Sequence, residues 1–505
     1  MARFYIENFG CRATQADGAA LERQFLERGF ERAQVARDAE IVVLNTCTVT
    51  DGADKDARAS IRRLQRVNPG CRILVTGCYA QRAPEELAAL PGVTWVVGNS
   101  HKHQAAEIAT ASLSAGFVSL AQLSGEATEF PHNRTERDCM GHPEVVQPEV
   151  IVGDIFAHTE LMAAPVFEAA NERTRPNLKV QDGCDNRCSF CVIPYVRGQS
   201  RSLPEERVIA EVRTLVEAGY REVVISGINL GRWGRDLEGS SQFSVLSSQS
   251  NQRHRLEDLI CAILARTFLE KLRISSVEPM DWSDELIELV ACSSRIAKHA
   301  HVPLQSGSDA VLRRMHRKYR PWHYQEKILK IRAAMPFAAI GADVMVGFPG
   351  ETEAEFAETR RMIEELPFTY LHVFTYSARP GTPAAEHAGQ VPVALARERN
   401  RILREIASQK KVAFMQSLMG TTVEAITLHT GGADFTEALT DNYLKTKIAG
   451  DIEANRWIQL HVQAAEGEML VGWPVTPSVV IGKTDSKPAP SSYRESAPNL
   501  TNALT

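Results

Sequence analysis

Three cysteines in the segment GCDNRCSFC have the spacing of a metal-binding loop. Cys184, Cys188 and Cys191 form a C-x3-C-x2-C pattern just after the strand-like run LKVQ. A short loop can direct three thiolates at one centre, which suits an iron–sulfur cluster with one iron left open for a substrate or cofactor. Zinc usually needs four ligands in two pairs, and no fourth Cys or His lies nearby. Three unrelated buried cysteines are the remaining alternative, but clustered cysteines in a cytosolic chain favour metal binding or redox chemistry.

Three further cysteines each follow a predicted strand near the N-terminus. Cys11 follows RFYIENF, Cys47 follows IVVLN and Cys78 follows ILVTG. Because open α/β sheets bind ligands at the carboxyl ends of their strands, these thiols could meet in space and hold a second cluster. The alternative is that they pack in the core, as free cysteines often do. Cys71 precedes its strand, so we expect it at the opposite edge of the sheet and not as a ligand.

The elements that must position these cysteines predict an α/β protein. Residues 1–110 alternate strand and helix signals, which favours an open parallel sheet. From residue 178 onward six strand-like runs alternate with helical ones: LKVQ, EVVISG, KLRISS, HAHVPL, AIGADVMVG and YLHVFTY. These repeats fill about 200 residues, whereas a closed eight-fold barrel usually needs about 250, so we expect an incomplete (β/α) barrel.

The remaining segments complete the predicted domain organisation. After the N-terminal domain, residues 111–177 form a linker or insertion, and residues 178–414 form the barrel domain with a solvated Ser- and Gln-rich loop over 236–254. Short strands over 415–483 predict a small C-terminal β-barrel. The Pro- and Ser-rich tail, residues 484–505, is expected to be disordered.

Composition excludes several classes of protein. The 505-residue chain carries 57 Lys and Arg against 62 Asp and Glu, so it is no bulk polycation, and any nucleic-acid contact must use local basic patches. No apolar run approaches the ~20 residues that span a bilayer, and MARFYIENFG has no signal-peptide pattern. We therefore expect a cytoplasmic protein without membrane contact, in which the ten cysteines stay reduced.

The cysteine loop after the first barrel strand resembles the radical S-adenosylmethionine superfamily. The resemblance implies that Cys184, Cys188 and Cys191 hold a 4Fe-4S cluster whose open iron binds S-adenosylmethionine. One electron from the cluster would then cleave this cofactor to a 5′-deoxyadenosyl radical. Such a cofactor carries the difficult chemistry, while the protein orients the reactants.

The segments ENFGCRATQ, LNTCTVT, TGCYAQ and VQDGCDNRCSFCVIPYVRG together are similar to the methylthiotransferases of this superfamily, over residues 1–100 and 178–450. This resemblance implies an auxiliary 4Fe-4S cluster on Cys11, Cys47 and Cys78. It also implies a radical S-adenosylmethionine barrel and a C-terminal RNA-binding domain of the TRAM type. The auxiliary cluster would carry sulfur as methylated sulfide, and a second S-adenosylmethionine would supply the methyl group.

Members of that family modify adenosine 37 of tRNA or an aspartate of a ribosomal protein. The strings FGCR, CYAQ, QDGCDNRC and LTDNYLKTKI resemble the branch that adds a methylthio group to C2 of N6-threonylcarbamoyladenosine. Isopentenyladenosine in tRNA and the ribosomal aspartate are the alternative substrates. The implied partners are the anticodon loop of tRNA, an external electron donor and a sulfur source of unspecified identity.

Polar residues at the predicted carboxyl ends of the barrel strands are candidates for binding S-adenosylmethionine. ISGINLG offers Gly227 and Asn229, SSVEP offers Ser276 and Glu278, and HVPLQSGSD offers Gln305. Active sites of (β/α) barrels form at these ends, where a carboxylate or amide could hold ribose hydroxyls. Ordinary strand-to-loop turns are the alternative for Gly227 and Asn229, because Gly and Asn are common in turns.

Two basic segments are candidates for RNA contact. LRRMHRKYRPWHYQEKILKIR carries eight Lys and Arg against one Glu, with Tyr319, Trp322 and Tyr324 between them. Basic groups can neutralise phosphates, and aromatic rings can stack on unpaired bases. A second basic run, residues 397–411, leads into the C-terminal domain. A solvated helix face is the alternative explanation for such charge runs.

Overall fold

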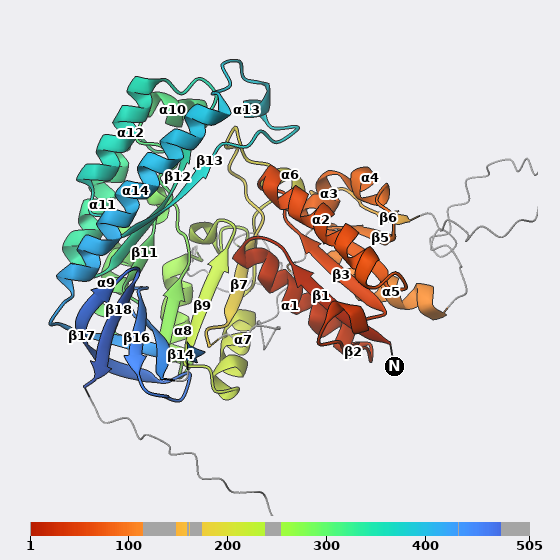
Figure 1. Ribbon diagram of the computed structural model, residues 1–505, viewed down its shortest axis with the longest axis horizontal. Helices are drawn as coiled ribbons and strands as arrows, with labels where there is room; N and C mark the ends of the chain where they lie inside the picture. Colours follow the sequence, from red (N-terminus) through yellow and green to blue (C-terminus); the bar gives the residue numbers. More distant parts are fainter. Residues whose placement is uncertain are drawn as a thin grey trace, which may run out of the picture.

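The computed structural model describes residues 2–114, 148–158, 161, 174–237, 254–432 and 434–475. These residues form three units: an open sheet with helices, a larger open barrel and a small closed β-barrel (Figure 1). The predicted α/β fold with this order of units is confirmed. Most of the predicted linker, most of the Ser- and Gln-rich loop and the whole tail lie outside the described residues.

The first unit is a parallel sheet with the strand order β2-β1-β3-β4-β5-β6. Its strands are β1 (Arg3–Asn8), β2 (Glu31–Arg32), β3 (Ile41–Thr46), β4 (Arg72–Gly77), β5 (Val93–Gly98) and β6 (Glu149–Ile151). Its helices are α1 (Arg12–Glu27), η1 (Ala36–Asp38), α2 (Asp51–Val67), α3 (Cys78–Arg82), α4 (Pro84–Ala88), η2 (Lys102–Gln104) and α5 (Ala105–Ser114). Strand β6 comes from the segment expected to be a linker and extends the sheet in parallel beside β5.

Helices cover both faces of this sheet, which explains its short apolar strands. Phe25 of α1 and Ala109 of α5 pack with Val43 on one face, while Ile61 of α2 packs with Val42 on the other. Strand β3 is buried at every position. A strand covered on both sides is expected to read as a continuous apolar run, as IVVLN does. The carboxyl ends of β1, β3 and β4 therefore meet at one edge of the sheet.

The second unit contains the six predicted parallel strands in two adjoining sheets, β10-β9-β7-β8 and β11-β12-β13. The strands are β7 (Asn177–Asp182), β8 (Arg201–Ser202), β9 (Glu222–Gly227), β10 (Lys271–Ile274), β11 (His299–His301), β12 (Ala339–Val346) and β13 (Tyr370–Thr375). A parallel bridge between Leu272 and Ile296 joins the two sheets, and β8 is a short antiparallel addition. The barrel is thus incomplete, as the strand count predicts.

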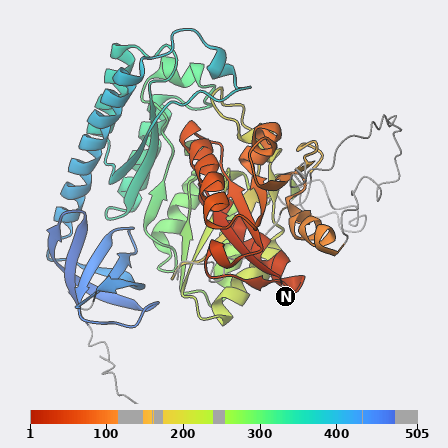
Figure 2. The same ribbon diagram turned by 45° about the vertical axis from the view of Figure 1, so that its right-hand side comes forward.

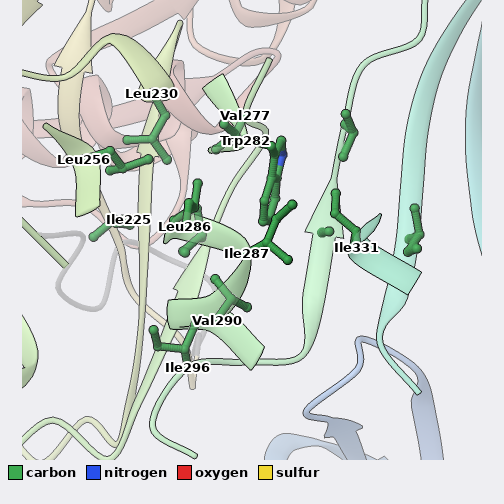
Figure 3. Close-up of a cluster of buried hydrophobic side chains, with 14 of the residues drawn as sticks. Ile225, Leu230, Leu256, Val277, Trp282, Leu286, Ile287, Val290, Ile296 and Ile331 are labelled. Carbon is green, nitrogen blue, oxygen red and sulfur yellow. The ribbon is translucent and has the colours of Figure 1, made fainter. Parts of the chain in front are cut away.

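Helices connect and cover the strands of this unit. They are α6 (Ile193–Arg197), α7 (Glu205–Glu217), η4 (Leu230–Arg232), α8 (Leu256–Arg266), η6 (Pro279–Asp281), α9 (Asp284–Cys292), α10 (Asp309–Arg314), α11 (Pro321–Ala334), α12 (Glu353–Glu365), α13 (Pro383–Glu386) and α14 (Val393–Ser417). Figure 3 shows Trp282 within the core between strands and helices, close to Leu286, Ile287 and Val290 of α9. This packing holds the strands rigidly, so that residues at the strand ends have fixed positions.

The third unit is a closed barrel with the strand order β14-β15-β16-β18-β17, which confirms the predicted C-terminal β-barrel. Its strands are β14 (Thr422–Gly432), β15 (Phe435–Thr440), β16 (Lys445–Ala449), β17 (Trp457–Glu466) and β18 (Met469–Pro474). In Figures 1 and 2 the long helix α14 runs along the outside of the open barrel and ends at this small barrel. Arg273 of the open barrel donates a 2.9 Å hydrogen bond to the backbone oxygen of Asp441, so the two units are in direct contact. Among the described helices, none has the length and apolarity needed to cross a membrane.

A buried ion network joins the first unit to the open barrel. Asp17 of α1 pairs with Lys102 of its own unit at 2.9 Å, and also with Lys179 and Arg197 of the barrel. Asp182 completes the network with distances of 2.7 Å to Lys179 and 2.9 Å to Arg197. All five residues are buried. Burial alone would raise the pKa of Asp17, but the surrounding cations outweigh burial and hold this pKa well below its usual range.

Replacing Asp17 by Asn should strongly destabilise the contact between the two units. The three surrounding cations would lose one of their two carboxylates, and breaking a buried ion pair typically costs about 3–5 kcal/mol. Urea unfolding followed by tryptophan fluorescence measures this loss. The matched control is Asp38→Asn, which removes an exposed carboxylate 3.7 Å from Arg37. The control should change the free energy of unfolding by less than about 0.5 kcal/mol. Equal effects of the two substitutions would contradict a network that holds the units together.

Candidate functional site

The cysteine triplet lies in the loop between β7 and α6, at the carboxyl end of the first barrel strand. The backbone N–H of Cys184 donates to the Gly198 oxygen at 3.1 Å, and that of Cys191 donates to the Cys188 oxygen at 3.1 Å. Burial, with a contribution from the negative charge of Cys188, raises the pKa of the Cys184 thiol to about 11 and that of Cys191 to about 12. The three sulfurs are therefore close enough to repel one another when they ionise.

The second set of cysteines comes together at the carboxyl edge of the first sheet. Cys11 precedes α1, Cys47 follows β3 and Cys78 begins α3. Burial raises the pKa of Cys47 to about 12, and repulsion from Cys78 and Cys11 contributes to this rise. Gly10 has a φ of +100°, and an added Cβ there would lie 2.5 Å from the Cys47 Cβ. Glycine at this position thus permits the close approach of Cys47 to the loop that carries Cys11.

The two sets of cysteines adjoin across one small apolar cluster. Val192, Ile193 and Val196 at α6 pack against Cys78 of the second set and against Cys184 and Cys191 of the first. The asparagine Asn99, which follows β5, donates to the Val196 backbone oxygen at 2.7 Å and ties the two units together at this point. Groups bound at the two sets would therefore face a common region.

The chemistry of each cysteine set suits an iron–sulfur cluster. Thiolates are the usual protein ligands of such clusters. Each set offers three cysteines, which leaves one iron of a cubane without a protein thiolate. Among the described residues, no three Cys, His, Asp or Glu side chains converge closely enough to hold one metal ion. The donor type and the number of ligands therefore fit two 4Fe-4S clusters.

Polar side chains donate hydrogen bonds to the sulfurs. Arg317 donates to the Cys188 Sγ at 3.3 Å, Asn229 to the Cys184 Sγ at 3.7 Å and Asn99 to the Cys78 Sγ at 3.6 Å. Hydrogen bonds of this kind shift the reduction potential of iron–sulfur clusters. Sequence reasoning missed Asn99, and it assigned Arg317 to RNA contact. No local pattern distinguishes either residue, because each reaches its cysteine only through the tertiary fold.

Arg197 links the buried ion network to the second set of cysteines. Burial would lower the pKa of Arg197, but the negative charges of Asp182, Cys78 and Asp17 keep it well above its usual value. A fixed guanidinium beside this set would offset the negative charge of thiolates that hold a metal cluster. The network that joins the units thus also borders the candidate cluster site.

The structure places Gly227 and Asn229 beside the cysteine triplet. Gln181 of β7 accepts a 2.7 Å hydrogen bond from the Asn229 backbone N–H through its Oε1. An added Cβ on Gly227 would lie 2.7 Å from the same Gln181 oxygen, so glycine leaves room for this amide. Gln181 is fully buried and was not among the residues that the sequence singled out. It holds the loop after β9 in position next to Cys184.

The other three candidate cofactor contacts lie at the same end of the barrel. Glu278 forms an ion pair with Arg317, which also donates to the Cys188 sulfur. Arg317 therefore bridges Glu278 and Cys188. Ser276 is 2.7 Å from His301, measured from Oγ to Nδ1, so its hydroxyl points into the barrel. Gln305 has a φ of +63°, and its backbone N–H donates to the Asp343 oxygen at 2.8 Å.

The basic segment around residue 320 does not form the predicted stacking surface. Tyr319 and Tyr324 are 1% and 0% exposed, and their hydroxyls donate to the backbone oxygens of Leu304 and Val302. The prediction that these two rings stack on RNA bases is wrong, because they pack in the core between the strands and helices of the barrel unit. Trp322, by contrast, is 57% exposed.

Most of the arginines in that segment already form ion pairs within the protein. Arg313 pairs with Asp309 at 2.9 Å and Arg314 pairs with Glu355 at 2.8 Å. Arg317 is buried against Glu278 and Cys188 and is not available to a phosphate. The number of basic residues in this segment is therefore a poor guide to how many of them can bind a phosphate.

Iron content tests the two candidate cluster sites. The chain reconstituted without oxygen should bind about eight iron atoms, since each of two cubanes holds four. Replacing Cys11, Cys47 and Cys78 together by Ala should leave about four, and replacing the other three cysteines should do the same. Cys71→Ala is the matched control, because Cys71 is also buried in the first unit but lies before β4. A triple variant that keeps the full iron content would contradict the site that it removes.

Comparisons with known proteins agree with this arrangement. Residues 3–98 match the uncharacterized protein family UPF0004, and residues 178–363 match the Radical SAM superfamily. Over 459 residues the chain is 36% identical to the threonylcarbamoyladenosine tRNA methylthiotransferase MtaB of Bacillus subtilis, covering 89% of this chain and 91% of that protein. It is 29% identical to the tRNA-2-methylthio-N(6)-dimethylallyladenosine synthase of Desulfitobacterium hafniense, covering 83% of this chain and 84% of that one.

A solved structure shares the fold. The radical S-adenosylmethionine methyltransferase TsrM from Kitasatospora setae superposes with a TM-score of 0.50, covering 85% of this chain and 79% of that one. At 15% sequence identity this likeness concerns the fold alone. With the relatives, the two family matches and the two adjoining cysteine sets considered together, the chain is an enzyme that belongs to the methylthiotransferase family of the radical S-adenosylmethionine superfamily.

Proposed function

We propose that this enzyme adds a methylthio group to C2 of N6-threonylcarbamoyladenosine at position 37 of tRNA, using two 4Fe-4S clusters and S-adenosylmethionine. The observation that carries the proposal is the contact of both cysteine sets with Val192, Ile193 and Val196. A reaction that joins sulfur to an activated carbon needs both cofactor sites next to one substrate atom. The 36% identity to a threonylcarbamoyladenosine enzyme supports this substrate.

Each cysteine set has its own role in the proposal. Cys184, Cys188 and Cys191 hold the cluster that binds S-adenosylmethionine, and the set of Cys11, Cys47 and Cys78 holds the auxiliary cluster. When bound, these groups supply one-electron cleavage of S-adenosylmethionine and the sulfur that is transferred. The reducing electrons come from an external donor in the cytoplasm, where thiols stay reduced.

The residues around the triplet orient the reactants. Gln181 fixes the backbone of Asn229, and in this proposal Gly227 and Asn229 would then lie beside bound S-adenosylmethionine. The Arg317–Glu278 pair holds Cys188 and would present a carboxylate to the same cofactor. Ser276 and Gln305 border this site from the next strands of the barrel. In this proposal N6-threonylcarbamoyladenosine enters as an unpaired base of the anticodon loop, since sequence-specific RNA-binding proteins mostly recognise unpaired bases in loops.

The C-terminal barrel contacts the tRNA outside its reactive loop. Trp473 is 47% exposed and its ring lies 5.1 Å from that of His461. Exposed aromatic rings on a small β-barrel are suited to stacking on nucleobases. This feature favours an RNA substrate over the aspartate of a ribosomal protein. Isopentenyladenosine in tRNA remains the second candidate, because the relative from D. hafniense is named for the dimethylallyl substrate.

A parallel assay with three substrates tests the proposed function. The reconstituted enzyme receives tRNA with threonylcarbamoyladenosine, tRNA with isopentenyladenosine, or the ribosomal protein, and mass spectrometry detects the added methylthio group. We expect modification of the first substrate alone. Methylthiolation of the isopentenyl tRNA instead would assign the enzyme to the second candidate function. Modification of the ribosomal protein alone would overturn the RNA assignment.

A further inference from the structure

Strand β13 presents a row of three rings on one face. Side chains alternate along a strand, so Tyr370, His372 and Phe374 share a face. Their ring centres are 5.3 Å and 6.5 Å apart in sequence order. Leu371 and Val373 point the other way, into the core beneath α14. The row therefore faces the inside of the open barrel, and Phe374 is nevertheless 45% exposed. Because the interior of a (β/α) barrel is normally packed, an exposed ring there indicates space for a ligand.

Polar groups of the neighbouring strands surround this row. Asp343 of β12 is in register with His372. His301 of β11 packs edge-on against the His372 ring with centres 5.5 Å apart, and its Nε2 lies 3.5 Å from the Asp343 carboxylate. The other nitrogen of His301 contacts Ser276 at the carboxyl end of β10. The inner face of the barrel is thus aromatic and polar, not aliphatic.

Arg12 reaches the same region from the first unit. It directly follows Cys11, and its guanidinium donates a 3.1 Å hydrogen bond to the Tyr443 hydroxyl of the C-terminal barrel. Tyr443 in turn packs against Tyr370 of the row, with ring centres 5.9 Å apart, which places the guanidinium near the row of rings. Within the described ranges no carboxylate pairs with Arg12. A cation that projects from the auxiliary cluster site towards a ligand space, without an anionic partner, is suited to an anionic ligand.

The N6 substituent of threonylcarbamoyladenosine has complementary chemistry. It carries a carboxylate, a hydroxyl and ureido N–H groups, whereas an isopentenyl group has no polar atom. We propose that Arg12 binds the carboxylate of this substituent while His372 and Phe374 stack on the adenine. This inference rests on the proposed function and makes Arg12 a residue that determines its specificity. Asp343 would accept hydrogen bonds from the hydroxyl or ureido donors.

An apolar substituent would be disfavoured at such a site. It would desolvate Arg12 without supplying an anion and Asp343 without supplying a donor, and sites built for polar substituents reject analogues that lack them. A backbone phosphate of the tRNA is the competing ligand for Arg12, because this side chain also borders a cavity of about 370 Å³ with Arg175 and His429. The two ligands differ in one respect: a phosphate is present whether or not the base is modified.

Binding measurements separate these possibilities. Fluorescence anisotropy gives the Kd of the reconstituted full-length enzyme for two anticodon stem-loops, one with threonylcarbamoyladenosine and one with unmodified adenosine. Arg12→Gln should weaken binding of the modified RNA about 10- to 100-fold, as expected for a charge-assisted hydrogen bond, and leave binding of the unmodified RNA unchanged. Arg12→Lys should restore part of the loss. Arg23→Gln, which removes another arginine of α1 that is 38% exposed, is the matched control and should change neither Kd.

Two further measurements keep the inference falsifiable if Arg12→Gln assembles poorly. Wild-type enzyme should bind an RNA whose threonyl carboxylate is converted to its amide about 10- to 100-fold more weakly than the parent RNA. Phe374→Ala should weaken binding of both RNAs alike, by about 5- to 150-fold, as expected for the loss of one stacked base. An equal loss for both RNAs in Arg12→Gln would assign Arg12 to a phosphate and overturn the inference. The inference is also overturned if wild-type enzyme methylthiolates the modified RNA but binds this RNA and its amide with the same Kd. Wild-type enzyme that methylthiolates neither RNA would instead refute the proposed function.

Discussion

The arrangement of the whole active region depends on the carboxylate of Asp17. It is the point at which a helix of the first unit meets two cations of the open barrel, Lys179 and Arg197, in a space without solvent. Separating the two units would leave several buried charges without partners. Arrangements in which the units are partly separated are therefore unfavourable. The two cysteine sets come from different units, and their distance is therefore set by this network. The buried ion pairs thus fix the relative position of the two cysteine sets, which chemistry between two cofactors requires.

The incomplete barrel provides the second condition for function. Six parallel strands leave one side unclosed, and α1 of the first unit lies against β7 there (Figure 1). Residues from three units can consequently border one interior: Arg12 from the first, His301 and Phe374 from the second, and Tyr443 from the third. In a closed eight-stranded barrel the same positions would be filled by packed side chains.

Sequence patterns predicted the elements well and the contacts between them poorly. The continuous apolar run IVVLN predicted a strand covered on both faces, and β3 is buried throughout. The placement of cysteines after such strands predicted that they would gather at one edge. By contrast, the basic segment with Tyr319 and Tyr324 was misinterpreted, because residue counts do not show which side chains of a segment face the core. Arg197, Asn99 and Gln181 were missed for a related reason, since each acts on residues far away in the chain.

The environment of the cysteines also affects the enzyme before it carries any iron. Burial and mutual repulsion raise the pKa of Cys47 and Cys191 to about 12, so these thiols remain protonated at neutral pH. The thiolate is the form that binds metal, so loading of iron must displace protons from these two sulfurs. Cluster assembly should therefore become more favourable as the pH rises.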